Sequence, residues 1–217
     1  GAGHAGIEAA LALARLGNKT LCLSVTLDNA GYLACNPSIG GTAKGHLVRE
    51  VDALGGEIGR AADKTLTQLR MLNSSKGPAV HSLRAQVDKY KYHEYMKSTL
   101  ENEKNLFLRQ GEAKNIIVEN GEIRGVETVT GLKYLAKAVV LACGVYLKST
   151  IIVGNVIEER GPVCFPRANY LSDSLAREGF TLRRFKTGTP ARVNGDSVDL
   201  NKLEIQYGED TPYSFCA

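Results

Sequence analysis

The chain opens on a glycine-rich turn, Gly1-Ala2-Gly3-His4-Ala5-Gly6, which has the spacing G-x-G-x-x-G and runs directly into an Ala- and Leu-rich stretch at residues 7–14. In dinucleotide-binding folds the first glycine allows a tight turn, the second lets a pyrophosphate approach the backbone, and the third lets helix and sheet pack closely. The pyrophosphate then faces free N–H groups at the positive end of the helix. We therefore expect Gly1, Gly3, His4, Ala5 and Gly6 to hold a dinucleotide cofactor.

A β-branched and apolar run of strand length, residues 19–25, follows this helix and has the size expected of a nucleotide-binding unit. The strand that should precede Gly1 lies outside the chain, so a purely structural glycine turn is the alternative. An acid usually ends the second strand and binds the ribose. Ser24 and Thr26 stand there instead, with Asp28 just beyond. Either a hydroxyl replaces the carboxylate or Asp28 reaches back.

Residues 28–41 have the composition of a loop, and the paired glycines Gly40 and Gly41 allow a ligand to approach the backbone closely. With Asn36, these glycines are further candidates for binding the cofactor. Thr42 is a candidate cap for a helix over residues 43–60. Its apolar residues fall on one predicted face: Leu47, Val51, Leu54 and Ile58.

Cys35 lies within this loop and has two interpretations. It is either a small buried thiol or a reactive thiol whose pKa is lowered by Lys44, His46 and a nearby helix N-terminus. The chain has five cysteines, an odd number, and no C-x-x-C pair. We therefore expect neither a disulfide framework nor a metal site, and a reducing compartment fits better.

Residues 70–93 carry five Lys or Arg and one acid, an excess as large as the net charge of +4 for all 217 residues. This stretch is either a solvated face or a surface that contacts the phosphates of a cofactor or of RNA. We predict a helix over residues 84–103 with Tyr92, Tyr95, Met96, Thr99 and Leu100 as its buried stripe. A second basic segment, residues 183–192, is either a surface loop or an anion-binding lip. The candidates for RNA or substrate contact are Lys44, Arg70, Lys76, Arg84, Lys186 and Arg192.

The middle of the chain predicts a small antiparallel meander. A short strand at residues 106–108 precedes strands at 113–118, 123–129 and 133–136, and Asn120-Gly121 is a strong hairpin signal. Residues 137–144 then predict a buried parallel strand that ends at Gly144, where a cofactor could lie. This order resembles the FAD-binding domains of the glutathione-reductase class.

We therefore expect an α/β fold: a glutathione-reductase-type, FAD-binding, Rossmann-like domain with a β-meander, truncated at both ends. Residues 1–153 would form the FAD-binding domain. Residues 154–217, with a helix at 172–178, would form a linker and the start of an inserted second domain. No apolar run is long enough to span a bilayer.

Long motifs along the chain carry a family resemblance: residues 1–6 (GAGHAG), 35–41 (CNPSIGG), 44–56 (KGHLVREVDALGG), 70–73 (RMLN), 75–80 (SKGPAV), 84–86 (RAQ) and 186–190 (KTGTP). Together they closely resemble the MnmG (GidA) family of FAD-dependent tRNA-modifying enzymes, over nearly the whole chain.

The resemblance implies that a carboxymethylaminomethyl or aminomethyl group is added to carbon 5 of the wobble uridine of tRNA. It implies a GTPase partner, MnmE, and a homodimer. Methylene-tetrahydrofolate would supply the carbon and NADH would reduce the flavin. The cysteine that matches Cys35 is a proposed catalytic residue of the family. The location would be the bacterial cytoplasm, or mitochondria in a eukaryote.

Two other functions are alternatives: a stand-alone NADH oxidase or flavin reductase without an RNA partner, and a nucleotide-binding interaction module without catalysis.

Overall fold

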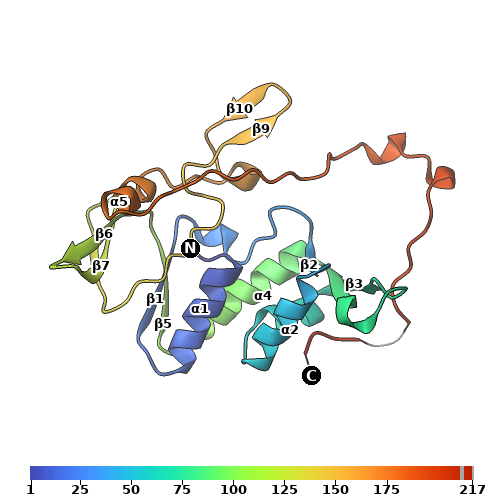
Figure 1. The fold of residues 1–217 in the computed structure, drawn as a ribbon, viewed down its shortest axis with the longest axis horizontal. Helices are drawn as coiled ribbons and strands as arrows, with labels where there is room; N and C mark the ends of the chain where they lie inside the picture. The colour runs from blue at the N-terminus through green and yellow to red at the C-terminus, as the bar shows by residue number, and fades with distance from the viewer. Residues whose placement is uncertain (211–212, 217) are drawn as a thin grey trace.

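A parallel strand pair with helices packed against it forms the centre of the computed structural model, which describes residues 1–210 and 213–216 (Figure 1). Helix α1 (His4–Arg15) starts directly after Gly3, and strand β1 (Thr20–Ser24) pairs with β5 (Leu106–Gln110). Helix α4 (Lys89–Asn102) buries Tyr92, Met96 and Leu100 completely in the same core. The predicted turn–helix–strand unit is confirmed, and so are three of the five residues of the predicted stripe, while Tyr95 and Thr99 are only half-buried.

The predicted helix over residues 43–60 is wrong in its bounds. The structure has two helices there, α2 (Gly45–Ala53) and α3 (Ile58–Lys64). Ala43 has a φ of 58° and Gly55 a φ of 86°, and neither backbone conformation can continue a right-handed helix. Thr42 caps neither helix.

The predicted apolar stripe of this region is also wrong in part. Leu47 and Leu54 are 58% and 89% exposed, and Val48 is the apolar side chain that α2 buries.

The predicted helix over residues 84–103 begins at Lys89 instead. Asp88 caps α4, since its side chain accepts hydrogen bonds from the amides of Tyr90 and Lys91. The residues before it form strand β4 (Ser82–Val87), which lies between β2 (Ser38–Gly40) and β3 (Leu66–Leu72) in a three-stranded antiparallel sheet. This sheet was not predicted from the sequence.

The meander is confirmed. Strands β6 (Ala113–Glu119), β7 (Glu122–Thr128) and β8 (Lys133–Leu135) are antiparallel, and Asn120 and Gly121 have φ angles of 53° and 77° at the hairpin turn. Helix α5 (Leu171–Arg177) packs on β6, where the hydroxyl of Ser174 accepts a hydrogen bond from the amide of Ile116.

The predicted buried strand over residues 137–144 is wrong. Among the described residues no strand pairs with this segment, and most of it is exposed. Strand β1 pairs with β5 alone, so no neighbour supplies the ladder hydrogen bonds that would make a parallel strand here. The segment still runs beside Gly1, close to the carbonyl of Ala142.

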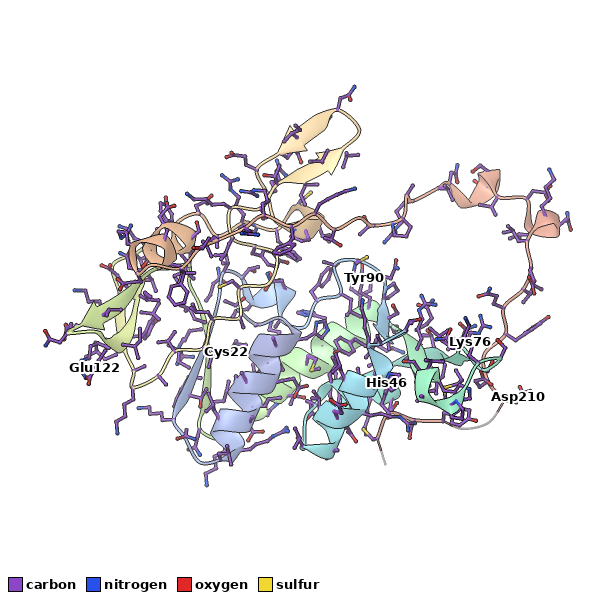
Figure 2. The ribbon with its side chains drawn as sticks, viewed as in Figure 1. Cys22, His46, Lys76, Tyr90, Glu122 and Asp210 are labelled. Carbon is purple, nitrogen blue, oxygen red and sulfur yellow. The ribbon has the colours of Figure 1, made fainter. Side chains whose placement is uncertain are left out.

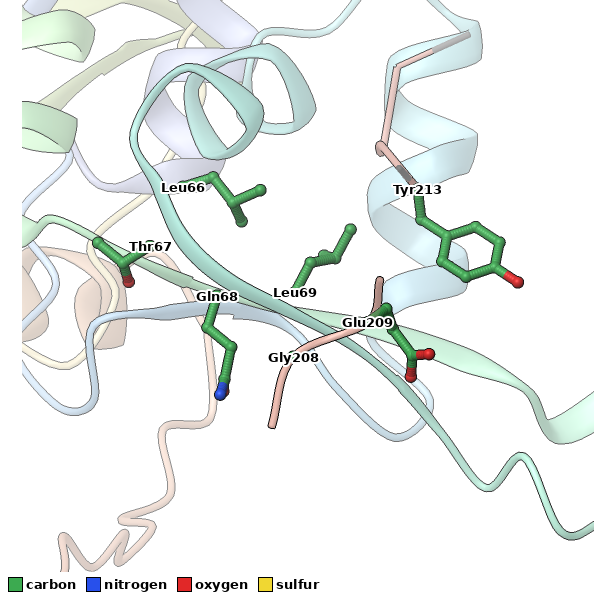
Figure 3. A pocket seen from close by; sticks show the side chains of 7 residues that line it. All are labelled: Leu66, Thr67, Gln68, Leu69, Gly208, Glu209 and Tyr213. Atoms are coloured by element: carbon green, nitrogen blue, oxygen red, sulfur yellow. The ribbon is translucent and has the colours of Figure 1, made fainter. Parts of the chain in front are cut away.

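The last third of the chain leaves the core and returns to it (Figure 1). It begins with a hairpin of β9 (Ile151–Val153) and β10 (Val156–Glu158), and residues 180–205 are almost entirely exposed. Residues 206–209 then run along the edge of β3, where the amide of Glu209 donates to the carbonyl of Leu69 (Figure 3). Phe215 packs against Gly40 of β2 and Gly59 of α3 with 3% of its surface exposed.

Within the described residues, no helix combines the length and the apolar character needed to cross a bilayer.

Candidate dinucleotide site

A cavity of about 130 Å³ lies where α1 begins and β1 ends. Loop residues of the first third, the start of the meander and the segment after residue 141 enclose it together. Its walls are Gly1, Ala2, Gly3, Ser24, Val25, Asn29, Tyr32, Ala113, Ala142, Cys143, Gly144, Tyr146, Leu147, Ala168 and Leu171. The predicted residues Gly1, Gly3 and Gly144 therefore share one cavity, although Gly144 lies more than a hundred positions after the other two.

The glycine turn suits an anion at the start of α1. A Cβ atom on Gly6 would collide with the carbonyl oxygen of Gly1, whereas one on Gly3 would meet nothing within 4 Å. No side chain caps this helix and its first turn holds no acid. The first amides of α1 thus remain available to a diphosphate, which the helix dipole favours.

His4 turns its imidazole into the core rather than into the cavity. Its ring lies 5.9 Å from that of Tyr92, centroid to centroid, and its Nε2 has no hydrogen-bond partner among the described residues. Burial lowers the pKa of His4. His4 can therefore offer an anion its backbone amide, while its side chain joins α1 to α4.

The carboxyl end of β1 presents hydroxyl and amide groups. The Ser24 hydroxyl is 2.9 Å from the carbonyl oxygen of Thr26 and 3.1 Å from Oδ1 of Asn29, and Asn29 and Tyr146 both line the cavity. Thr26 and Asp28 do not line the cavity, and the Thr26 hydroxyl instead accepts a hydrogen bond from the amide of Asp28.

Asn29, Tyr32, Cys143 and Tyr146 line the cavity but were missed by the sequence analysis. Burial raises the pKa of both the Cys143 thiol and the Tyr146 hydroxyl. For Cys143 and Tyr146 the available signal was their position at the carboxyl end of the predicted strand at 137–144, because ligands gather at the carboxyl ends of strands.

Cys35 is exposed and stands outside the cavity wall. The guanidinium of Arg192 donates to its carbonyl oxygen at 3.2 Å, so the distant basic segment touches this loop. Asn36, Gly40 and Gly41 also stand outside the cavity. Gly41 is tied to β4, because its amide donates to the carbonyl of Leu83. The cysteine loop and the cavity are thus two separate places, joined through the segment that carries Tyr32.

The six basic candidates are not in one cluster. Arg70 and Arg84 lie opposite each other on β3 and β4. Lys76 lies at the tip of the connection between these strands, far from Glu122 at the tip of the meander (Figure 2). Lys44 precedes α2, and Lys186 and Arg192 lie on the exposed segment 180–205.

A family model described as "Glucose inhibited division protein A" matches residues 1–217. The chain belongs to the GidA family. It is 58% identical over 217 residues to a protein of Alkaliphilus oremlandii and 56% identical over 215 residues to one of Bacillus subtilis, both named tRNA uridine 5-carboxymethylaminomethyl modification enzyme MnmG. Each alignment covers 99% of this chain and 34% of the relative. The chain thus spans about a third of these relatives.

Solved structures agree with this assignment. The form II crystal structure of Aquifex aeolicus GidA matches with a TM-score of 0.95 and 50% identity, over 100% of this chain and 36% of that one. A GidA-related protein from Thermus thermophilus matches with a TM-score of 0.59 and 25% identity, over 83% of this chain and 67% of that one. The GidA family membership and the fold class predicted from the sequence are confirmed.

Proposed function

We propose that the full-length protein containing this chain modifies carbon 5 of the wobble uridine in tRNA, by adding a carboxymethylaminomethyl or aminomethyl group. The observation that carries the proposal is the uncapped start of α1 opening on a cavity, in a chain so similar to proteins named for this modification. The match to that family favours this function over a stand-alone NADH oxidase or flavin reductase.

FAD is the cofactor we propose for the cavity. The amides after Gly3 would hold its diphosphate, and Ser24, Asn29 and Tyr146 would hold its ribose. Pockets that enclose a small molecule usually measure about 300–1,000 Å³, so a cavity of about 130 Å³ would take one part of the dinucleotide. When bound, the flavin supplies redox chemistry, while the protein orients it and excludes water.

Cys35 is the catalytic residue in this proposal. Its side chain is exposed on a loop, where a pyrimidine base could reach it. The further partners and substrates are the GTPase MnmE, a second copy of the full-length protein, methylene-tetrahydrofolate as carbon donor, glycine or ammonia as nitrogen donor, and NADH as reductant. The compartment would be the bacterial cytoplasm, or mitochondria in a eukaryote.

Replacing Cys35 in the full-length protein tests this function. With the GTPase partner and tRNA, Cys35→Ser should abolish the modified nucleoside while FAD binding and NADH oxidation persist. Equal loss of all three would contradict a catalytic role for the thiol. Wild-type protein that oxidises NADH and leaves tRNA unmodified would favour the stand-alone flavin reductase.

A further inference from the structure

The sheet β2–β4–β3 has one apolar face and one polar face. Ile39, Ala85 and Leu69 occupy one row of the register and are all buried against the core. Side chains alternate along a strand, so the residues on either side of this row face the opposite way. Figure 3 shows Gln68 and Leu69 leaving β3 on opposite sides.

The polar face carries two rows of polar side chains, followed by a third row in which Leu72 stands opposite Ser82. Ser38, Gln86 and Gln68 form the first row, and Gly40, Arg84 and Arg70 form the second. All the side chains of these first two rows are half-buried. The glycine carries no side chain, so nothing from β2 stands beside Arg84 in the second row.

The two arginines stand directly opposite each other on neighbouring strands. Like charges in this position repel, which destabilises a sheet unless something compensates them. Among the described residues, neither guanidinium has a carboxylate within ion-pair distance. The face therefore carries two positive charges whose natural complement is an anion.

The returning segment of the chain holds one of these arginines in place. The guanidinium of Arg70 donates to the side-chain oxygen of Gln206 at 2.6 Å, and the side-chain amide of Gln68 donates to the carbonyl oxygen of Gln206 at 2.9 Å. Arg70 is thus oriented by a neutral group that leaves its charge intact. Arg84 makes no hydrogen bond to the described residues through its side chain, so its donors remain available.

We propose that Arg70 and Arg84 form a clamp for one phosphate of the substrate RNA, next to the nucleotide that Cys35 receives. A planar guanidinium fork matches two phosphate oxygens, so a pair of forks can hold one phosphodiester in a fixed orientation. Gln206 is a positioning residue of this clamp. The inference rests on the proposed function, because it takes the ligand to be the tRNA.

The chain connection between the clamp and the thiol loop favours RNA over a small anion. β2 begins three residues after Cys35, and the amide of Val87 at the end of β4 donates to the carbonyl of Pro37. Gly40, which pairs with Arg84, lies five positions after Cys35, which is at most about 18 Å of extended chain. An RNA strand can therefore touch both places, since its phosphates and bases repeat along one continuous chain.

The test measures binding of unmodified tRNA to the full-length protein across a salt series. Arg84→Gln should weaken binding roughly tenfold, as expected for a lost charged hydrogen-bonded contact. The slope of log K against log salt should become smaller by about one. Arg84→Lys keeps the charge, so it should keep the slope while recovering only part of the affinity. Arg124→Gln, an arginine on the distant strand β7, is the matched control and should change neither.

Retention of FAD by each variant shows that it folds. An unchanged salt slope in a folded Arg84→Gln variant would overturn the clamp. Normal RNA binding together with weakened use of NADH or folate would also overturn it, because the bound anion would then be a small molecule. Wild-type protein that binds no tRNA at any salt concentration would instead contradict the proposed function itself.

Discussion

At the scale of the residue, we expect His4 to make the stability of the fold depend on pH. Burial lowers its pKa below the ordinary value of 6.5, so the folded protein holds it neutral while the unfolded chain takes up a proton near that pH. The contribution of His4 to stability is complete above about pH 6.5 and is lost as the pH falls toward the folded pKa. We expect the unfolding temperature of the full-length protein to fall between about pH 7 and pH 5, and His4→Asn to flatten that decline. Replacing His46, which is exposed (Figure 2), is the control and should leave the decline of the unfolding temperature with pH unchanged. The same decline in His4→Asn as in the wild-type protein would contradict this role of His4.

Two cysteines should differ sharply in reactivity. Burial, together with the carboxylates of Asp52 and Asp63, raises the pKa of the Cys216 thiol to about 12, and that thiol donates to Oδ1 of Asp52 at 2.9 Å. The thiolate is the species that reacts, so alkylation at mildly alkaline pH should label exposed Cys35 and leave Cys216 unlabelled. Peptide mass spectrometry measures both sites. Asp52→Asn should accelerate labelling of Cys216, and equal rates in the two proteins would refute the role of this carboxylate.

At the scale of the element, one buried carboxylate joins three helices. Glu57, at the start of α3, accepts hydrogen bonds from Arg15 of α1 at 2.7 Å and from the hydroxyl of Tyr95 of α4 at 2.7 Å. Arg15→Met leaves this carboxylate without its charged partner. We expect this substitution to lower the free energy of unfolding by about 2 kcal/mol, which is at the low end for a buried ion pair because Arg15 is itself partly exposed. Urea unfolding measures it, and Lys91→Met, which breaks an exposed pair with Asp88, should cost at most about 0.5 kcal/mol. Equal losses would argue against the buried network.

The elements that the sequence predicted well are those with local signals. The Asn120-Gly121 turn and the 3.6-residue stripe of α4 both specify their own geometry. Strand β4 was missed although Leu83, Ala85 and Val87 alternate with polar residues as in a half-buried strand, because the strand runs directly into the helical pattern of α4. Residues 137–144 have the opposite problem, because an apolar run becomes a strand only where a neighbouring strand pairs with it. The same limit applies to the site: the glycine turn is visible in the sequence, whereas Asn29 and Tyr146 meet there only through the fold.

At the scale of the whole molecule, the end of the described chain is part of the core. Phe215 packs beside Gly40 and Gly59, and the carboxylate of Asp63 accepts hydrogen bonds from the amides of Phe215 and Cys216. The exposed stretch 180–205 is therefore attached at both of its ends. Phe215 also packs against Gly40 of β2, so we expect that losing this anchor would loosen the sheet that carries Arg70 and Arg84.

Phe215→Ala should lower the free energy of unfolding by about 3–5 kcal/mol, because it removes a large buried ring and leaves a cavity that the backbone of β2 and α3 cannot fill. Phe185→Ala is the matched control, since Phe185 is 91% exposed on the segment 180–205 and its loss should change stability by no more than about 0.5 kcal/mol. Denaturant unfolding of the two variants compares the costs, and limited proteolysis reports on attachment. Phe215→Ala should speed cleavage within residues 180–210 and reduce affinity for tRNA in the same protein. Equal unfolding midpoints for the two variants would mean that the returning segment does not contribute to the core, and the support it lends to the sheet would then have to come from α2 and α3 alone.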